Sequence, residues 1–364
     1  MKNNQYCVIM AGGHLNRFWP ISREGMPGHF RDISGTGKSL VRMAYERCLG
    51  VVPEENILII TLGKFKGIIN EQIPELPKEN LLLEPYARRT APCIAYATYT
   101  LLKRNPDAVM AATPADIIVN DEQLFKETMT HALDYAEKNP VLVTLGVKPD
   151  RPDTEYGYIQ AVGGKGACSS GDPVKVKTFT EKPDAEIADV FFRSGEFFWN
   201  SGIFVWQASV IKEEMERYIP EITRLFDGWE GALGSPAEEV FIERAYTDCI
   251  KLSIDYGVME KTDRAWVYPI QFGWSDIDSW ENYYSSIQRK DQDGNISNTQ
   301  MKILQNDKRN IILTKNKNKL LMIRGLEDCL VVDTDDVLLI CPRDDKQYKE
   351  LVNSTRMPGY DKYR

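Results

Sequence analysis

Glycine, acidic and basic residues stand together where they can handle a phosphorylated ligand. The string V-I-M-A-G-G-H-L-N-R-F-W-P-I-S-R at 8–23 leads from an apolar run into Gly12 and Gly13. The backbone amides of such a loop can meet phosphate oxygens, and Arg17 and Arg23 can neutralise the phosphate charge. Taken alone, the glycine pair is equally typical of a plain tight turn.

Two aspartates are candidate metal ligands. Asp116 in T-P-A-D-I-I-V (113–119) follows a buried apolar run, so we expect it at the edge of the sheet where open α/β folds bind ligands. Asp276 in F-G-W-S-D-I-D-S-W (272–280) can supply a second ligand. Because Mg²⁺ takes one or two carboxylates together with phosphate oxygens, the pair predicts a magnesium site. Helix capping is the alternative for Asp116 and for Asp278.

Three short strings mix polar with apolar residues, as a sugar site requires: Y-G-Y-I, F-T-E-K-P and W-N-S-G-I-F, at 156–159, 179–183 and 199–204. Glu181 and Asn200 can hold sugar hydroxyls, and Lys182 can pair with a sugar phosphate. Each string by itself is also compatible with a purely structural role.

The elements that must position these residues alternate along the first 150 residues. The patterns predict strands at Tyr6–Met10, Asn56–Thr61, Ala108–Ala112 and Val141–Gly146, and helices at Ser39–Cys48, Thr90–Lys103 and Asp121–Lys138. This alternation indicates an α/β domain with a mixed, mainly parallel sheet. Beyond residue 150 we expect strands at Tyr156–Ala161 and Val174–Glu181, and helices at Ala185–Ser194, Ala208–Tyr218 and Pro236–Tyr246.

The polar, turn-rich segment Lys290–Asn298 predicts a linker between a domain at 1–289 and a second domain at 290–364. Short β-rich runs follow at regular spacing, which suggests a small all-β unit or solenoid. These runs are Asn310–Thr314, Leu320–Ile323, Cys329–Asp333 and Val337–Ile340, and a helix is expected at Asp344–Asn353.

Composition narrows the class of protein. The 364 residues carry a net charge of −8, which argues against nucleic acid as a partner because such proteins need a basic face. No apolar run approaches the ~20 residues of a membrane span. Seven cysteines without C-x-x-C pairs predict ordinary buried thiols in a cytoplasmic protein, and three histidines argue against a histidine-based zinc site.

In order and spacing, the strings resemble the mannose-1-phosphate guanylyltransferase family of sugar nucleotidyltransferases. The resemblance includes E-P-Y-A-R-R-T-A-P (84–92), P-x-x-P-x-T-x-Y-G-Y-I (149–159) and S-I-D-Y-x-V-M-E (253–260). It implies a Rossmann-like nucleotide-diphospho-sugar transferase fold. The tail string G-L-E-D-C-L-V-V-D-T-D-D-V-L-L-I (325–340) resembles that family's β-helical C-terminal portion.

The resemblance also implies a reaction, in which GTP and mannose-1-phosphate give GDP-mannose and pyrophosphate with Mg²⁺ as cofactor. The implied catalytic residues are Arg17, Asp116 and Asp276, the two aspartates being the metal ligands. Nucleotide contacts are implied for Ala11, Gly12, Gly13, Arg17, Glu84, Pro85, Arg88, Thr90 and Ala91. Substrate contacts are implied for Tyr156, Gly157, Glu181, Lys182, Asn200, Ser201 and Asp255. A homodimer is expected, with neither nucleic acid nor membrane as a partner.

The sequence departs from the family pattern in its phosphate-binding half. Where the family reads G-G-x-G-T-R, P-K-Q-F and W-S-D-x-G, this chain has Leu15 and Asn16, Gly28 for the lysine, and Asp278 for the last glycine. Leucine fits poorly where a glycine conformation is needed. Three hypotheses therefore stand: an active guanylyltransferase, a transferase for another nucleotide and sugar phosphate, and a non-catalytic relative that binds such ligands.

Overall fold

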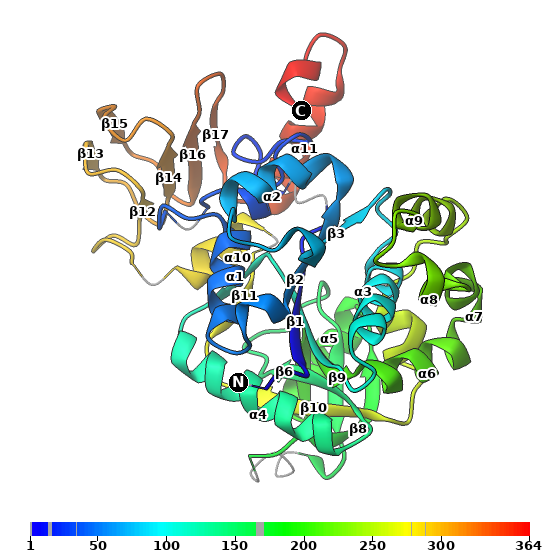
Figure 1. The fold of residues 1–364 in the computed structure, drawn as a ribbon. Helices are drawn as coiled ribbons and strands as arrows, with labels where there is room; N and C mark the ends of the chain where they lie inside the picture. Colours follow the sequence, from blue (N-terminus) through cyan, green and yellow to red (C-terminus); the bar gives the residue numbers. More distant parts are fainter. Residues whose placement is uncertain (1, 14–16, 34, 165–170, 278, 288) are drawn as a thin grey trace. The chain divides into compact units, whose positions relative to one another are not determined.

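The computed structural model describes residues 2–13, 17–33, 35–164, 171–277, 279–287 and 289–364. The chain divides into two compact units (Figure 1). Unit 1 comprises Met1–Gly13, Ala44–Ala115 and Val119–Trp274, and unit 2 comprises His14–Met43, Asp116–Ile118 and Ser275–Arg364.

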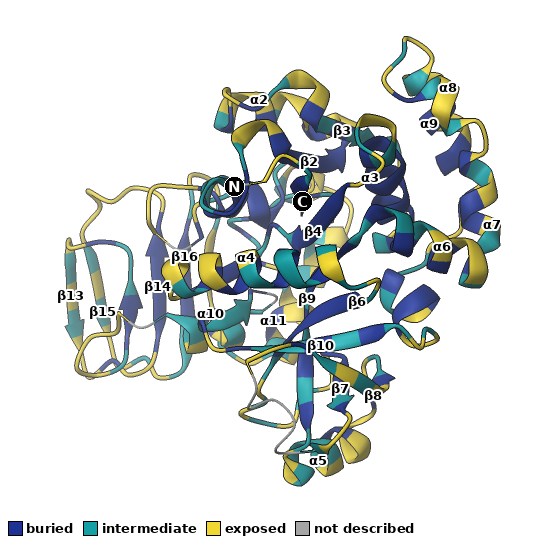
Figure 2. Cartoon of the chain, turned by 60° about the horizontal axis from the view of Figure 1, so that its bottom comes forward, coloured by how far each residue is buried: buried dark blue, intermediate teal, exposed yellow. Residues whose placement is uncertain are grey.

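A nine-stranded sheet forms the centre of unit 1, and its middle strands are almost wholly buried (Figure 2). Its order is β3-β2-β1-β4-β9-β6-β10-β8-β7. The bounds are β1 Gln5–Met10, β2 Ile57–Leu62, β3 Leu81–Glu84, β4 Val109–Pro114, β6 Leu142–Val147, β7 Tyr158–Ala161, β8 Val174–Thr180, β9 Phe197–Gln207 and β10 Ala265–Ile270. Strand β1 pairs in parallel with both β2 and β4, as the alternation of strands and helices predicts.

The sheet is mixed, as predicted, but strand β9 makes it less parallel than the sequence indicates. It runs antiparallel to β4, β6 and β7. Among the described residues, four pairings of this sheet are parallel and five are antiparallel. Strand β9 was not predicted, because polar residues in W-N-S-G-I-F interrupt its apolar pattern. Its apolar side chains, such as Ile203 and Phe204, are buried.

The six helices predicted before residue 250 lie close to their predicted positions, whereas α2, α7 and α8 were not predicted. Helix α3 (Thr90–Arg104) carries Pro92 in its first turn, and α4 (Glu122–Lys138) is capped by Asp121, whose carboxylate accepts from the Leu124 amide at 2.9 Å. The remaining α-helices are α2 Lys66–Gln72, α5 Ala185–Ser194, α6 Ala208–Tyr218, α7 Pro220–Thr223, α8 Trp229–Ala232 and α9 Glu238–Thr247, while α1 covers Leu40–Leu49. Among the described residues, no helix has the length and apolarity to cross a bilayer.

Unit 2 contains two small sheets built from short strands. The larger has the order β12 (Ile296–Ser297), β14 (Ile311–Thr314), β16 (Cys329–Asp333) and β17 (Leu338–Pro342). Its first three strands are parallel, and the last pairing is antiparallel. The smaller sheet joins β13 (Lys302–Gln305) to β15 (Leu321–Arg324) in parallel. Helices α10 (Trp280–Ser286) and α11 (Asp345–Asn353) complete the unit.

The expected linker Lys290–Asn298 is partly wrong, because its end forms strand β12. The buried Asn295 side chain accepts from the Asn310 amide at 3.0 Å and donates to the Asp307 carbonyl at 2.9 Å. Asn310 in turn accepts from the Cys329 amide at 2.9 Å. These side-chain bonds link successive turns of chain and satisfy backbone groups that would otherwise be buried unpaired.

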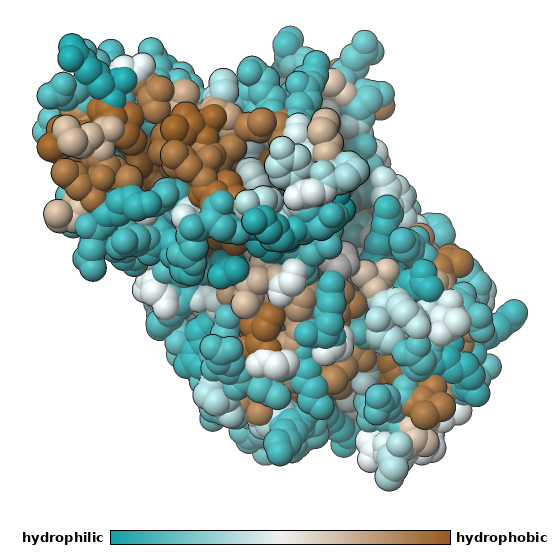
Figure 3. Space-filling model, turned by 90° about the horizontal axis from the view of Figure 1, so that it is seen from above, coloured by the Kyte–Doolittle hydropathy of each residue, from teal (hydrophilic) through white to brown (hydrophobic). Residues whose placement is uncertain are grey.

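Apolar side chains gather on one face of unit 2 (Figure 3). Large hydrophobic residues that remain exposed there include Met322 at 70%, Leu338 at 62% and Ile340 at 53%. The cysteines that the structure describes are free thiols, and all except the half-exposed Cys329 are buried. The buried thiols agree with the sequence-based expectation.

Replacement of Gly146 by alanine should destabilise unit 1. A Cβ at this position would lie 2.5 Å from Val267 Cγ2 and 2.9 Å from Phe198 Cβ, so the sheet must shift at a cost of about 1–3 kcal/mol. Urea denaturation measures the loss. Gly67→Ala in α2 is the matched control, because no atom lies within 4 Å of the added methyl and alanine favours the helix by up to about 1 kcal/mol. Equal stability of Gly146→Ala and the wild type would contradict this packing.

Candidate functional site

The loop after β1 is anchored to the neighbouring strand. The Ala11 amide donates to the Ile60 carbonyl at 2.8 Å, and the Thr61 hydroxyl donates to the Ala11 carbonyl at 2.8 Å. Gly12 is needed here for space, since a Cβ would lie only 2.5 Å from Glu84 Oε2. The loop glycine therefore accommodates a carboxylate of the same unit.

Glu84 ends strand β3 and is only 4% exposed. Its Oε1 accepts from the Tyr246 hydroxyl at 3.0 Å. Burial raises the pKa of Glu84 to about 7, and the bond from Tyr246 opposes this rise. A carboxyl group that titrates at neutral pH inside a fold is typical of functional sites, although structural networks produce the same shift.

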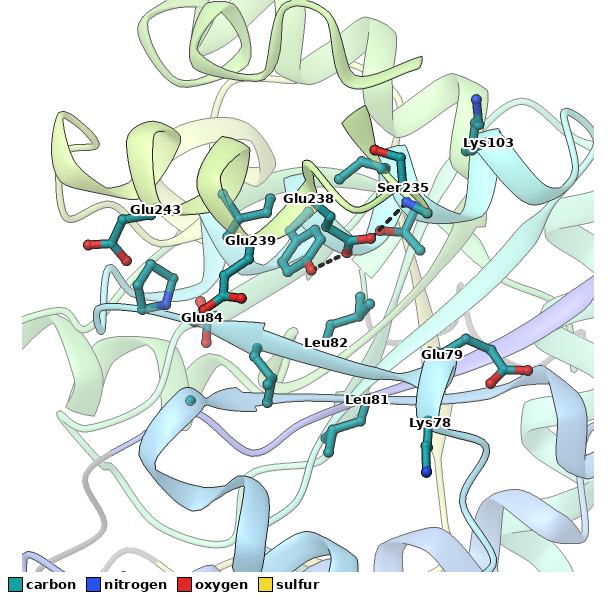
Figure 4. A pocket seen from close by; sticks show the side chains of 18 of the residues that line it. Lys78, Glu79, Leu81, Leu82, Glu84, Lys103, Ser235, Glu238, Glu239 and Glu243 are labelled. Carbon is teal, nitrogen blue, oxygen red and sulfur yellow. Dashed lines mark hydrogen bonds between the residues drawn. The ribbon is translucent and has the colours of Figure 1, made fainter. Parts of the chain in front are cut away.

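Glu84 and Pro85 line a cavity of about 720 Å³ at the end of β3 (Figure 4). On the opposite wall, Glu238 accepts from the Tyr96 hydroxyl at 2.5 Å and from the Gly234 amide at 2.7 Å. Two of the predicted nucleotide contacts thus face a cavity large enough for a small molecule.

The remaining predicted nucleotide contacts in unit 1 tie two loops together. The Arg88 guanidinium donates to the carbonyls of Tyr246 and Thr247 at 3.0 and 3.1 Å. The Thr90 hydroxyl accepts from the Ile254 amide at 2.9 Å, and the Ala91 amide donates to Leu252. The polar groups of Arg88 and Thr90 therefore fix the loop before α3 against the chain that follows α9.

Four of the predicted sugar contacts come together although they lie on separate segments. Gly157 precedes β7, Glu181 follows β8, Asn200 lies within β9, and Asp255 begins a short π-helical segment, Asp255–Met259. The Asn200 amide donates to the Gly157 carbonyl at 2.8 Å, and Asn200 Nδ2 donates to Asp255 Oδ1 at 2.8 Å. A Cβ on Gly157 would lie 2.3 Å from Glu181 Oε2.

Asn200 has its side-chain amide engaged at both ends. Its Oδ1 accepts from Thr144 Oγ1 at 3.0 Å and from the Gly202 amide at 3.2 Å, while its Nδ2 holds Asp255. Thr144 is fully buried within β6, and it was missed in the sequence because no motif contains it. A polar residue within an apolar run marks Thr144 in the sequence, but it does not indicate that Asn200 is the partner.

The other predicted sugar contacts, Tyr156, Lys182 and Ser201, differ in exposure and in their partners. The Tyr156 ring centroid lies 4.9 Å from that of Trp199 in a tilted arrangement and 5.5 Å from that of Trp274 in an edge-on arrangement, which gives an aromatic wall. Lys182 is half-exposed, with its Nζ 3.9 Å from Glu155 Oε2. Ser201 is 3% exposed, and its hydroxyl accepts from the Ile203 amide at 3.2 Å. Because side chains alternate along a strand, Ser201 points to the opposite face from Asn200.

Burial raises the pKa values of two acids in the cluster. Burial raises the pKa of Glu181 to about 8, with a further rise from Asp255 and an opposing effect from Lys182. Burial also raises the pKa of Asp255, while its own backbone amide and Asn200 oppose the rise. The buried Glu181 Oε2 has no hydrogen-bond partner among the described residues. At neutral pH this site can therefore offer both an O–H donor and a carboxylate acceptor to a polyhydroxyl ligand.

Asp116 and Asp276 lie on two neighbouring strands of unit 2. Asp116 precedes β5 (Ile117–Val119) and Asp276 ends β11 (Trp274–Asp276), and these strands pair with each other. The Ile277 amide donates to the Asp116 carbonyl at 3.3 Å. Both side chains are partly exposed. The pairing of β5 with β11 brings the backbones of the two residues close together, and carboxylates are ligands that Mg²⁺ accepts.

The described residues include no group of three or more acidic, histidine or cysteine side chains arranged to hold a metal. Arg17 has an exposed side chain, and its carbonyl accepts from the Tyr348 hydroxyl at 2.9 Å. Gly28 begins a buried 3₁₀ turn, Gly28–Phe30, in which the His29 ring packs 4.1 Å from Phe30. Leu15, Asn16 and Asp278, the other departures from the family pattern, lie outside the described residues.

Comparison with known proteins gives a consistent picture. Residues 6–293 match the family described as nucleotidyl transferase. The chain is similar to the mannose-1-phosphate guanylyltransferase of Escherichia coli K12, with 34% identity over 99% of this chain and 75% of that protein. It is similar to the mannose-1-phosphate guanylyltransferase RfbM of Salmonella typhimurium, with 32% identity over 98% of this chain and 74% of that protein. Among solved structures, one from Thermus thermophilus, described as a mannose-1-phosphate geranyltransferase, has a TM-score of 0.84 and 28% identity over 97% of this chain and 100% of that chain.

Stability should fall as pH rises from about 4.5 to about 8. In this window the folded Glu181 keeps its proton while the unfolded residue, with its ordinary pKa of 4.5, loses it, so the folded state binds more protons and the free energy of unfolding decreases with pH. Glu181→Gln should reduce this fall, as measured by urea denaturation at pH 5 and pH 8. Glu155→Gln, at an exposed carboxylate, is the control. An unchanged pH dependence in Glu181→Gln would show that the buried acid titrates normally.

Proposed function

Because the chain belongs to the nucleotidyl transferase family, and within it to the mannose-1-phosphate guanylyltransferases, we propose that it transfers GMP from GTP to mannose-1-phosphate, which gives GDP-mannose and pyrophosphate. The observation that carries this function is the 34% identity to such an enzyme over 99% of the chain. The cluster around Asn200 supports it, since that cluster has the donors and acceptors that a sugar needs.

In this reaction a phosphate oxygen of mannose-1-phosphate forms a bond to the α-phosphorus of GTP, and the bond from that phosphorus to the bridging oxygen of pyrophosphate breaks. The step needs alignment and charge neutralisation more than proton transfer. We assign the sugar hydroxyls to Glu181 and Asp255, and the sugar phosphate to Lys182. Asn200 acts by holding Asp255, with which it shares a hydrogen bond of 2.8 Å.

On the nucleotide side, we assign the phosphates to the loop amides at Gly12 and Gly13 and to Arg17. Glu84, Pro85 and the loop before α3 face the remainder of the nucleotide. Asp116 and Asp276 would hold Mg²⁺, which when bound neutralises charge on the phosphates. The pairing of β5 with β11 holds the backbones of these two residues close to each other.

Four finer features of the protein remain proposals. We propose that residues 290–364 form a domain of β-helix type, which the shared register of the parallel strands supports, since Ile311 pairs with Leu330 and Lys302 with Leu321. We propose a homodimer, supported by the exposed apolar face of unit 2, because large patches of this kind mark interaction surfaces. We also propose that the protein acts in the cytoplasm, and that it uses Mg²⁺ rather than another divalent ion.

The protein should release pyrophosphate from GTP and mannose-1-phosphate with Mg²⁺, and no other nucleoside triphosphate should replace GTP. Asp116→Asn and Asp276→Asn should each lower kcat by about 10²–10³, the scale on which a lost transition-state charge contact acts. Asp107→Asn, at an exposed loop position, is the control and should retain full rate. Release only with a different substrate pair would indicate another transferase, and ligand binding by calorimetry without turnover would indicate a non-catalytic protein.

The combined change Leu15→Gly and Gly28→Lys should raise turnover, because it restores the family's loop glycine and phosphate-facing lysine. One regained charge-assisted contact corresponds to about 10- to 100-fold in rate. Steady-state kcat with GTP measures the effect. Gly25→Lys adds the same charge at an exposed position with open space around it, and it should change little. No gain in the double variant would mean that these departures do not limit the reaction.

A further inference from the structure

Unit 2 contains a second cavity that none of the assigned substrate residues lines. It has a volume of about 570 Å³ and lies between the segment that follows Trp19 and the ends of β14 and β16. Apolar side chains, including Ile21 and Val332, form part of its wall, and Arg23 and Arg31 contribute guanidinium groups. This combination of an apolar wall with a few charged groups is typical of small-molecule sites.

Arg31 is held in this wall without a counter-charge. Its Nε is buried and has no hydrogen-bond partner among the described residues, and no carboxylate of those residues lies within ion-pair distance of its guanidinium. Burial lowers the pKa of Arg31, and the charge of Arg23 lowers it further. A half-buried guanidinium beside a like charge is costly unless an anion compensates it.

An ion pair and a hydrogen bond hold the Arg23 guanidinium in place near Arg31. Its Nη2 lies 2.9 Å from Asp336 Oδ1, and its Nε donates to the Pro20 carbonyl at 2.9 Å. The Asp336 carboxylate is thus already shared with Arg23 and with the Thr334 hydroxyl. Two guanidinium groups therefore line the cavity, and Asp336 pairs with Arg23 but not with Arg31.

The other acids of the cavity are engaged elsewhere. The Asp32 carboxylate accepts from the amides of Thr36 and Gly37 at 2.9 and 2.8 Å. Asp333 accepts from Lys319 at 2.8 Å and from the Thr314 hydroxyl at 2.9 Å, and Asp335 pairs with Lys315. The positive charge of Arg31 therefore remains to be balanced by something outside the described chain.

We propose that this cavity of unit 2 binds a small phosphorylated metabolite, whose phosphate lies against Arg31 and Arg23 and whose carbon frame packs on Ile21 and Val332. The planar fork of a guanidinium matches two oxygens of a phosphate, which would supply the counter-charge that Arg31 lacks. This site is additional to the proposed transfer reaction. Of its residues, only Arg23 was considered for the phosphate loop from the sequence, and the structure pairs Arg23 with Asp336.

The test compares the full-length wild type with Arg31→Met, using inorganic phosphate and glucose 6-phosphate as probes. Without added anion, Arg31→Met should unfold at a higher temperature than the wild type, because the substitution removes an uncompensated charge. Phosphate should raise the unfolding temperature of the wild type and have a much smaller effect on the variant. In calorimetry, the variant should bind each probe about 10- to 100-fold more weakly.

Arg309→Met is the matched control, since it removes an arginine of the same unit that is paired with Glu327 and Asp328 at 2.8 and 2.6 Å. It should not gain stability and should keep the full response to phosphate. An Arg31→Met variant that is less stable than the wild type, or that responds equally to phosphate, would overturn the proposal. If glucose 6-phosphate binds no more tightly than inorganic phosphate, the assignment of the apolar wall to a carbon frame is wrong.

Discussion

The hydrogen bonds of the Asn200 side chain hold the sugar-facing part of unit 1 together. One amide group joins strand β6 through Thr144, its own strand β9 through Gly202, and the π-helical segment through Asp255. Its backbone amide adds the loop before β7. Because each of these bonds is partly buried, loss of one partner leaves another polar group unsatisfied, at a cost of about 1–3 kcal/mol. The Asn200 side chain therefore adds to the backbone pairing of β9 with β6 and β7, and it also links β9 to the π-helical segment.

The same cluster raises the pKa values of the acids that it contains. Glu181 and Asp255 lie in one cluster, and both carboxyl groups have raised pKa values because burial disfavours their charged forms. Two full negative charges at this point would repel an incoming sugar phosphate. A carboxyl group that keeps its proton at neutral pH can donate a hydrogen bond to a hydroxyl without adding charge. In the proposed site, the half-exposed Lys182 would supply the positive charge that a phosphate requires.

Much of the fold could be predicted from periodicity, whereas part of the site could not. Buried parallel strands such as β1 and amphipathic helices such as α4 have clear patterns, and their predicted bounds agree closely with the structure. Strand β9 was missed because its polar residues interrupt the apolar run. The predicted sheet therefore lacked the antiparallel pairings that β9 makes with β4 and β6. Glu181 and Asn200 could be singled out by type, but the bond from Thr144 joins residues on different strands. A single sequence contains no signal for such a contact, because it depends on the register between β6 and β9.

Gly12 and Gly157 each lie against the side chain of a glutamate. In each case the space beside the α-carbon is taken by a glutamate oxygen, from Glu84 at 2.5 Å and from Glu181 at 2.3 Å. The two glycines are thus complementary in shape to a protein carboxylate, independently of any ligand. A larger residue at either glycine would therefore require the carboxyl end of its glutamate to shift. Covariation between these positions among relatives would therefore report on packing, even where both residues belong to a substrate-binding motif.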